Sequence, residues 1–227
     1  MQYLNDNWQL ALIPHSQLEK SVFPTTFSKA KDISKNIIPA SVPGNFELDM
    51  LKAGLIEDPY YGINVLSTRK LENLHLYYSC SFELNKQEDK DTFLVFEGID
   101  TVAEIYIDGQ MIAFTENMFI SHQFSLQDIS NGKHELMVHI IPACIYARNF
   151  HIPATCFSLP YNFDALVVRK APYMFGWDIM SRIVSGGIFK PCYIEQKNKT
   201  RIEDFYLATK ALNPTKTTAT LRYHIKF

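Results

Sequence analysis

The chain has 227 residues, of which 47% are hydrophobic and 13% aromatic, and its net charge is −2. This length and composition allow one substantial hydrophobic core. The lack of a basic excess argues against nucleic acid as a partner, and no apolar run approaches the length that spans a bilayer, so we expect no nucleic-acid and no membrane association.

One helix is predicted in the first third of the sequence. Asn45 can accept a hydrogen bond from the first helical turn, and the acidic side chains of Glu47 and Asp49 favour the positive end of a helix. Gly54 can end the helix because glycine readily adopts the left-handed conformation.

The following elements are predicted to be strands. Alternate apolar residues predict a half-buried strand from 77 to 84, in which one face carries Tyr78, Cys80, Phe82 and Leu84. The continuous apolar run Phe93–Phe96 predicts a strand covered on both faces. A third strand carries Ala103, Ile105 and Ile107 on its inner face, and Asp108-Gly109 predicts a hairpin turn into 111–114. Asn131-Gly132 predicts a turn into a strand with Leu136, Val138 and Ile140 inside. Short strands at this spacing predict an all-β sandwich or jelly roll.

The composition changes after Glu195. Residues 196–201 are polar and read as a linker, and two further strand patterns follow, at 202–207 and 219–227. Two strands cannot form an independently stable sandwich. We therefore expect a first domain over 1–195 and a truncated second domain over 196–227. A hairpin docked on the first domain is the alternative.

No metal, redox or phosphate site is predicted. The four cysteines lack CxxC spacing and are expected to be buried free thiols: Cys80, Cys144, Cys156 and Cys192. His134 and His139 fall on opposite faces of one strand and cannot form a ligand pair. No glycine-rich phosphate loop is present, and no cofactor is expected.

The segment Arg169–Arg182 has the strongest chemical signal. It reads Arg-Lys-Ala-Pro-Tyr-Met-Phe-Gly-Trp-Asp-Ile-Met-Ser-Arg and precedes the pair Gly186-Gly187. The indole of Trp177 offers a flat apolar face to the C–H bonds of a sugar, and the carboxylate of Asp178 can accept hydrogen bonds from two hydroxyls. Without its sequence context, this pair would be interpreted as a buried Trp and a turn-capping Asp.

Five motifs in order carry a family resemblance. They are Ile38–Gly44, Asp58–Gly62, Phe96–Gly109 with the following Asn117-Met118-Phe119, the segment Arg169–Asp178, and Ser185–Pro191. Together they resemble the N-terminal sugar-binding domain of family 2 glycoside hydrolases, and Arg169–Asp178 resembles the β-mannosidase branch. The resemblance covers nearly all of residues 1–195. It implies a galactose-binding-like jelly roll, followed by the first strands of an immunoglobulin-like domain and, outside this chain, a catalytic TIM barrel.

The resemblance also implies a role for this domain. Trp177 and Asp178 would shape the subsite of a terminal β-linked sugar, with Arg169, Lys170 and Arg182 either contacting sugar or supporting the loop. No catalytic residue is expected here, because the family's acid/base follows Asn and this chain has no Asn-Glu dipeptide. The fragment alone should therefore be inactive, and it should pack on the absent barrel.

Three alternatives stay open. The β-mannosidase pattern continues Trp-Gly-Pro where this chain has Ile179-Met180-Ser181, so another specificity, such as a β-galactosidase or β-glucuronidase, is retained. A non-catalytic carbohydrate-binding module is the second alternative, and a purely structural domain the third. The polar start of the sequence has no signal-peptide pattern, which leaves the cytoplasm or export with a removed signal as compartments.

Overall fold

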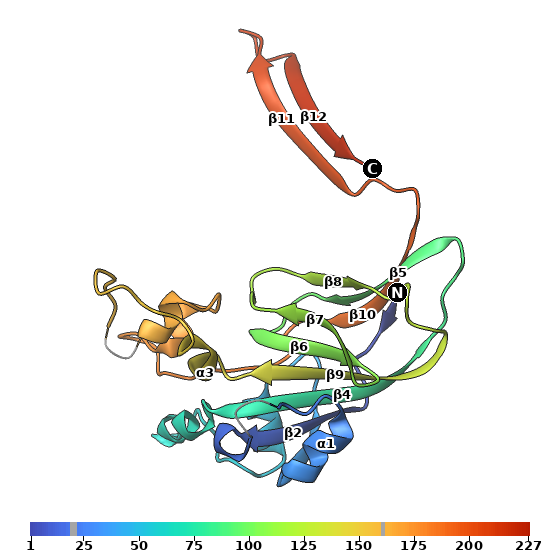
Figure 1. Cartoon of the computed structure of the whole chain (residues 1–227). Helices are drawn as coiled ribbons and strands as arrows, with labels where there is room; N and C mark the ends of the chain where they lie inside the picture. The colour runs from blue at the N-terminus through green and yellow to red at the C-terminus, as the bar shows by residue number, and fades with distance from the viewer. Residues whose placement is uncertain (19–21, 160–161) are drawn as a thin grey trace.

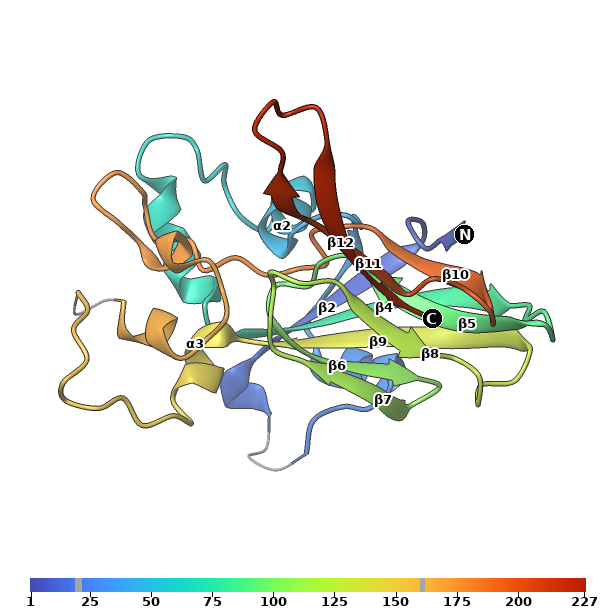
Figure 2. The same cartoon turned by 90° about the horizontal axis from the view of Figure 1, so that it is seen from above.

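The computed structural model describes residues 1–18, 22–159 and 162–227, and it is built mainly from two antiparallel sheets. The larger sheet has the order β3-β2-β4-β9-β6-β7 and the smaller has the order β1-β10-β5-β8. They pack as two layers with short helices and loops around their edges (Figures 1 and 2). The predicted β-sandwich is therefore confirmed.

The strands of the larger sheet are β2 (Trp8–Pro14), β3 (Asn36–Ala40), β4 (Leu74–Leu84), β6 (Val102–Ile107), β7 (Gln110–Thr115) and β9 (Gly132–Ile141). Those of the smaller sheet are β1 (Gln2–Tyr3), β5 (Lys90–Phe96), β8 (His122–Ser125) and β10 (Cys192–Asn198). The helices are α1 (Phe27–Ile33), α2 (Phe46–Lys52) and α3 (Ala143–Ala147), and the 3-10 helices are η1 (His15–Gln17), η2 (Asn64–Leu71), η3 (Phe163–Leu166) and η4 (Pro172–Phe175).

The main core lies between the two sheets. Its members include the predicted inward residues of β4, β6 and β9, and they pack against Leu94, Phe96 and Ile194 of the smaller sheet. The Asp108-Gly109 turn has a positive φ at both residues, 50° and 80°. Tight two-residue hairpin turns need this backbone conformation, and the turn joins β6 to β7. The alternation in the sequence thus correctly predicted which face of these strands is buried.

Helix α2 begins and ends as predicted. The Asn45 side chain accepts a hydrogen bond from Leu48 N at 3.1 Å, and Gly54 follows the helix with a φ of 69°. Helix α1 was not predicted, although Thr26 caps it through Lys29 N. It packs on the outer face of the larger sheet, where Phe27 and Ala30 meet Tyr77.

That outer face also holds a row of hydrogen-bonded side chains, here called the histidine row. His15 Nδ1 lies 2.9 Å from His75 Nε2, His75 Nδ1 lies 2.8 Å from His139 Nε2, and His139 Nδ1 lies 2.9 Å from Glu104 Oε2. His75 and His139 are fully buried, and Tyr77 stacks on the His139 ring. These residues are far apart in the chain, and the pairing of β2, β4, β9 and β6 brings them together.

The cysteines are free thiols, as expected, but burial differs among them. Cys80, Cys144 and Cys192 are buried, whereas Cys156 is exposed. The prediction of burial was therefore wrong for Cys156, which lies in the long connection after α3 rather than on a strand.

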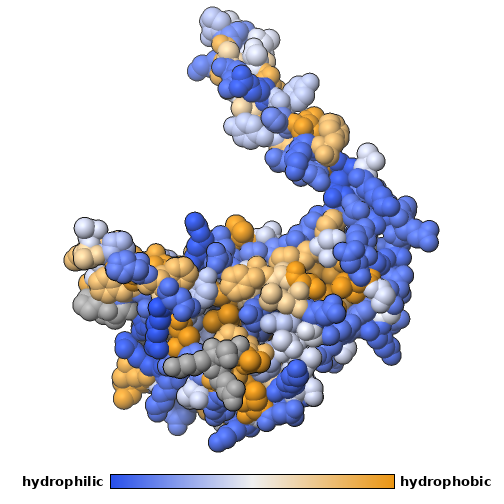
Figure 3. Space-filling view, viewed as in Figure 1, coloured by the Kyte–Doolittle hydropathy of each residue, from blue (hydrophilic) through white to orange (hydrophobic). Residues whose placement is uncertain are grey.

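The last two strands, β11 (Asp204–Leu212) and β12 (Ala219–Lys226), pair only with each other. The hairpin stands away from the sandwich, and most of its side chains are exposed (Figures 1 and 3). The division into a first domain and a truncated second domain stays a prediction. Residues 196–198 of the expected linker belong to β10, which pairs with β5. None of the helices in the described residues has the length and apolar character needed to cross a membrane.

Candidate functional site

The five sequence motifs converge around the loop Arg169–Arg182. Gly44 N donates to Ile188 O at 2.9 Å, Phe46 N donates to Gly186 O at 3.0 Å, and Met118 N donates to Arg169 O at 3.1 Å. Seen from above, this loop lies beside η2 and α2 at one side of the sandwich (Figure 2). Segments that are distant in sequence therefore build one local structure.

The contact between Gly187 and the backbone that precedes α2 is tight. Gly187 has a φ of 154°, and a Cβ atom there would lie 2.6 Å from Gly44 O. We expect Gly187→Ala to lower the free energy of unfolding by roughly 2 kcal/mol or more, measured by urea denaturation. Gly132→Ala is the matched control, because Gly132 also has a positive φ but has open space around it. If both variants lost the same free energy of unfolding, the loss would come from backbone strain and not from the contact with Gly44 O.

The Trp177–Asp178 pair lies at the tip of the loop. Gly176 has a φ of 101°, after which Trp177 and Met180 exchange backbone hydrogen bonds of 3.0 and 3.3 Å across a tight turn. The Trp177 side chain is 62% exposed. Asp178 is exposed, and its Oδ1 accepts a hydrogen bond from Ile179 N at 3.0 Å. The buried-Trp alternative therefore does not describe this residue.

Trp177 forms one wall of an open cleft of about 410 Å³. The other described lining residues are Ser158, Leu159, Asn162, Pro172, Tyr173 and Gly176. Apolar and aromatic walls with a few hydroxyl and amide groups suit the alternating C–H and O–H surface of a sugar. This cleft and Asp178 form the candidate sugar site.

Arg182 ties this loop to η2. Its guanidinium donates to both oxygens of Glu72 at 2.7 Å, to Phe175 O at 3.2 Å, and its plane lies over the Phe175 ring at 5.4 Å. The bidentate bond to Glu72 raises the pKa of Arg182 above its usual range. The geometry gives Arg182 a role in supporting the loop, and a direct contact with sugar stays a prediction.

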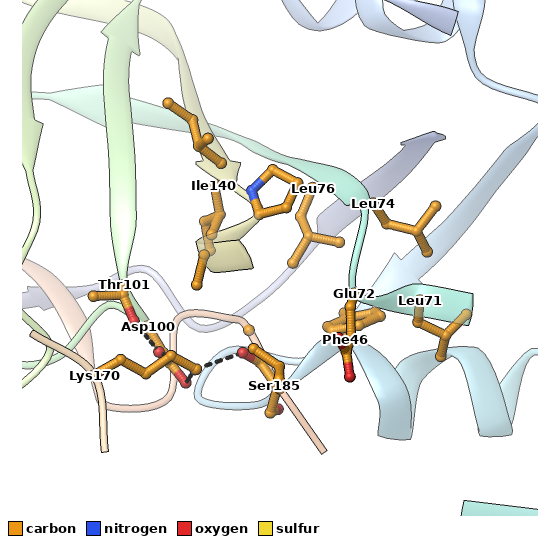
Figure 4. A pocket seen from close by; sticks show the side chains of 15 residues that line it. Phe46, Leu71, Glu72, Leu74, Leu76, Asp100, Thr101, Ile140, Lys170 and Ser185 are labelled. Carbon is orange, nitrogen blue, oxygen red and sulfur yellow. Dashed lines mark hydrogen bonds and ion pairs between the residues drawn. The ribbon is translucent and has the colours of Figure 1, made fainter. Parts of the chain in front are cut away.

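Lys170 is buried beneath the same loop. Its Nζ lies 2.5 Å from both oxygens of Asp100 and 2.7 Å from Ser185 O, and only 1% of the residue is exposed (Figure 4). The side chain therefore joins the Arg169–Arg182 loop to two of the other motifs. Arg169, its neighbour, is exposed, and its backbone pairs with the strand-like segment at Asn117.

Glu47 is a further candidate site residue, which was predicted only as part of the start of α2. Glu47 lies in the first turn of α2, is 6% exposed, and accepts a hydrogen bond from Ser185 Oγ at 2.8 Å. Burial raises its pKa from 4.5 to about 7. The sequence showed an acidic residue that favours a helix start, and nothing in the local pattern indicated that its side chain is buried.

Comparisons with known proteins agree on the family. Residues 26–190 match the glycosyl hydrolase 2 galactose-binding domain-like family. The β-mannosidase of Mus musculus is 31% identical over 177 residues, which cover 73% of this chain and 20% of that protein. The chain thus spans about a fifth of the length of the curated relatives it matches.

Solved structures give the same result. The crystal structure of a β-D-mannosidase from Dictyoglomus thermophilum superposes with a TM-score of 0.79 at 29% identity, covering 98% of this chain and 25% of that one. A β-D-glucuronidase from the same organism reaches 0.58 at 17% identity, covering 99% and 32%, and this likeness shows the fold alone. The chain belongs to the glycosyl hydrolase 2 galactose-binding domain-like family.

Proposed function

We propose that this chain is the N-terminal part of an exo-acting retaining β-glycosidase of the β-mannosidase type, and that its role is to shape the subsite of the terminal sugar. The observation that carries the proposal is the placement of an exposed indole and an exposed carboxylate next to each other, on a loop fixed from below. The β-mannosidase relatives support the choice of sugar.

Asp178 is the residue assigned to sugar hydroxyls. A charged acceptor that gains hydrogen bonds as the ring distorts lowers the barrier rather than only improving substrate binding. Trp177 gives the same ring an apolar surface. Lys170 and Arg182 act from within the protein by holding the loop, and Arg169 is exposed near its start.

The catalytic carboxylates belong to a barrel outside this chain. Retaining glycosidases need two carboxyl groups about 5–5.5 Å apart. We therefore expect this chain alone to be inactive, and we expect the exposed apolar side chains of its loops to pack against that barrel. The hairpin of β11 and β12, residues 204–226, is assigned to the opening strands of an immunoglobulin-like domain that the remaining sequence would complete.

The test uses the full-length protein. Asp178→Ala is expected to lower kcat/KM for p-nitrophenyl β-D-mannoside roughly 100-fold, mainly through kcat, since a bond to a charged group contributes about 1.5–3 kcal/mol. Asp89→Ala, an exposed acid between β4 and β5, is the control and should keep normal kinetics. Near-normal kcat/KM in a folded Asp178→Ala protein would overturn the role of Asp178.

A substrate panel separates the alternatives. Cleavage of the β-D-mannoside, with little cleavage of the β-D-galactoside and β-D-glucuronide, is the expected result. Preference for one of the other two sugars would assign a different family 2 specificity, which the replacement at Ile179, Met180 and Ser181 keeps open. Sugar binding without hydrolysis by the full-length protein would indicate a non-catalytic binding module.

A further inference from the structure

A second pocket is lined by the same loop as the Trp177 cleft. It has a volume of about 170 Å³ and is bounded by the start of α2, by the turn at Pro59-Tyr60, and by the later part of the loop. Tyr173 lines both this pocket and the Trp177 cleft. We call it the Glu47 pocket; its lining residues are Asn45, Glu47, Leu48, Pro59, Tyr60, Tyr173, Met174, Met180, Ser181, Ile183 and Ser185.

The Glu47 carboxyl is the most deeply buried polar group of this pocket. Its Oε2 accepts the bond from Ser185 Oγ at 2.8 Å. The carboxyl also interacts with the backbone N–H of Glu47 itself, and Glu47 lines the pocket. Because burial raises the pKa of Glu47 to about 7, the group can both donate and accept a hydrogen bond near neutral pH.

Two further polar groups of the pocket are available to a ligand. The Asn45 side chain uses its oxygen to cap α2, and its NH₂ group has no partner within the described ranges. The Ser181 hydroxyl is likewise without a protein partner in the described part of the chain. Donors and acceptors therefore converge from two separate elements on one small space.

The remaining walls are apolar or aromatic. Tyr60 and Tyr173 contribute rings, while Leu48, Met180 and Ile183 contribute aliphatic surface. No Lys or Arg side chain lines the pocket within the described ranges, so a negatively charged ligand would find no counter-charge there. The volume is below the ~300–1,000 Å³ typical of drug-sized sites, and it therefore suits one ring rather than an extended chain.

We propose that the Glu47 pocket is a second carbohydrate subsite, which takes one uncharged pyranose unit through Glu47, Asn45 and Ser181. This inference rests on the proposed function for the class of ligand, but it concerns a different sugar unit from the one at Trp177. Tyr173, which lines both spaces, separates the two units. A subsite of this kind contributes to selection of the substrate without any contact to the reacting atoms.

The experiment is a titration of the full 227-residue chain, labelled with ¹⁵N, with methyl β-D-mannopyranoside. Saturable amide shifts are expected at Asn45, Leu48, Ser181 and Ser185. Glu47→Leu should weaken binding by roughly tenfold, and Ser181→Ala by about threefold. Glu57→Leu is the matched control, because Glu57 is an exposed acid near the pocket that does not line it, and its affinity should equal that of the wild type.

The effect of the ligand's charge on affinity is an independent measurement. Methyl β-D-glucuronide should bind more weakly than the mannoside, and the difference should grow as Glu47 ionises above pH 7. Glu47→Gln should keep mannoside binding and lose this pH dependence. If the amide spectrum shows that Glu47→Leu is poorly folded, Ser181→Ala and Glu47→Gln are used in its place. Both of these variants preserve the shape of the pocket.

Three results would overturn the inference: no saturable shifts at the pocket, shifts confined to Trp177 and Asp178, or unchanged binding by Glu47→Leu. None of them decides the proposed function, which depends on Asp178 and on the kinetics of the full-length protein. Conversely, normal kinetics of Asp178→Ala with intact sugar binding at Glu47 would remove the role of Asp178 and leave the second subsite standing.

Discussion

Replacing Lys170 by Met is expected to lower the free energy of unfolding by about 3–5 kcal/mol, the usual cost of removing one partner of a buried ion pair. Asp100 is only 4% exposed, so its carboxylate would be left in the interior without the cation. Ser185 O would lose its donor as well. Urea denaturation with an unchanged m value measures the loss.

Two controls separate charge burial from general disturbance. Arg169→Met changes an exposed neighbouring cation and should alter stability by less than about 0.5 kcal/mol. The double variant Lys170→Met with Asp100→Asn removes both charges and should recover a large part of the loss. If Lys170→Met costs less than about 1 kcal/mol, the ion pair is not what anchors the loop.

The Lys170–Asp100 ion pair also explains how the loop can hold Trp177 and Asp178 in exposed positions. Lys170 from below and Arg182 from the η2 side fix both ends of the segment, and the tip with Trp177 and Asp178 lies between them. The conformational entropy of that tip is then lost when the protein folds, so sugar binding does not have to order the loop. We therefore expect Lys170→Met to weaken sugar binding, although Lys170 is buried beneath the loop.

The strands were predictable because burial on one face produces a period of two. In β4, the run from Cys80 to Leu84 alternates as expected, while the preceding Leu76–Ser79 is buried on both faces. Helices α1 and α2 both have only seven residues, and α2 was predicted from its cap and its acidic first turn, whereas α1 has no acidic residue in its first turn and was missed. A segment that short does not develop a recognisable helical period.

The site was predictable only in part. The motif named Trp177 and Asp178 as sugar contacts, which stays a prediction, and it named Lys170 and Arg182 without distinguishing a sugar contact from internal support. Their partners, Asp100 and Glu72, are separated from them by 70 and 110 residues. Contacts at such separations depend on strand pairing and loop closure, which the local pattern does not contain. Glu47 was missed for the same reason, as its partner Ser185 is 138 residues away.

The histidine row shows how a hydrogen-bond network can fix protonation states. The Glu104 carboxylate accepts from His139 Nδ1–H, so His139 Nε2 is the acceptor for His75 Nδ1–H, and His75 Nε2 accepts from His15. Burial lowers the pKa of His75 to about 2, with His139 and His15 adding to the shift, and burial also lowers the pKa of His139. Both buried rings are therefore neutral in the folded protein.

This neutrality predicts a loss of stability in mild acid. The unfolded chain binds protons at these histidines below about pH 6.5, while the folded protein does not, so each buried ring makes the free energy of unfolding fall as pH decreases, by up to about 1.4 kcal/mol per pH unit. Other groups act in the opposite direction. The pKa values of His134 and Glu47 are raised, so their contributions are present at lower pH and are lost as pH rises.

A difference measurement isolates His75 from these opposing groups. His75→Gln should destabilise the protein near pH 7.5, because two ring hydrogen bonds are changed. Relative to wild type, the variant should then regain about 1.4 kcal/mol on going to about pH 5.5, since it lacks the group that takes up a proton on unfolding. His151→Gln, an exposed histidine, is the control and should follow the wild-type pH dependence. A constant difference between wild type and His75→Gln at both pH values would mean that His75 titrates normally in the folded protein, and the row would then not hold neutral rings.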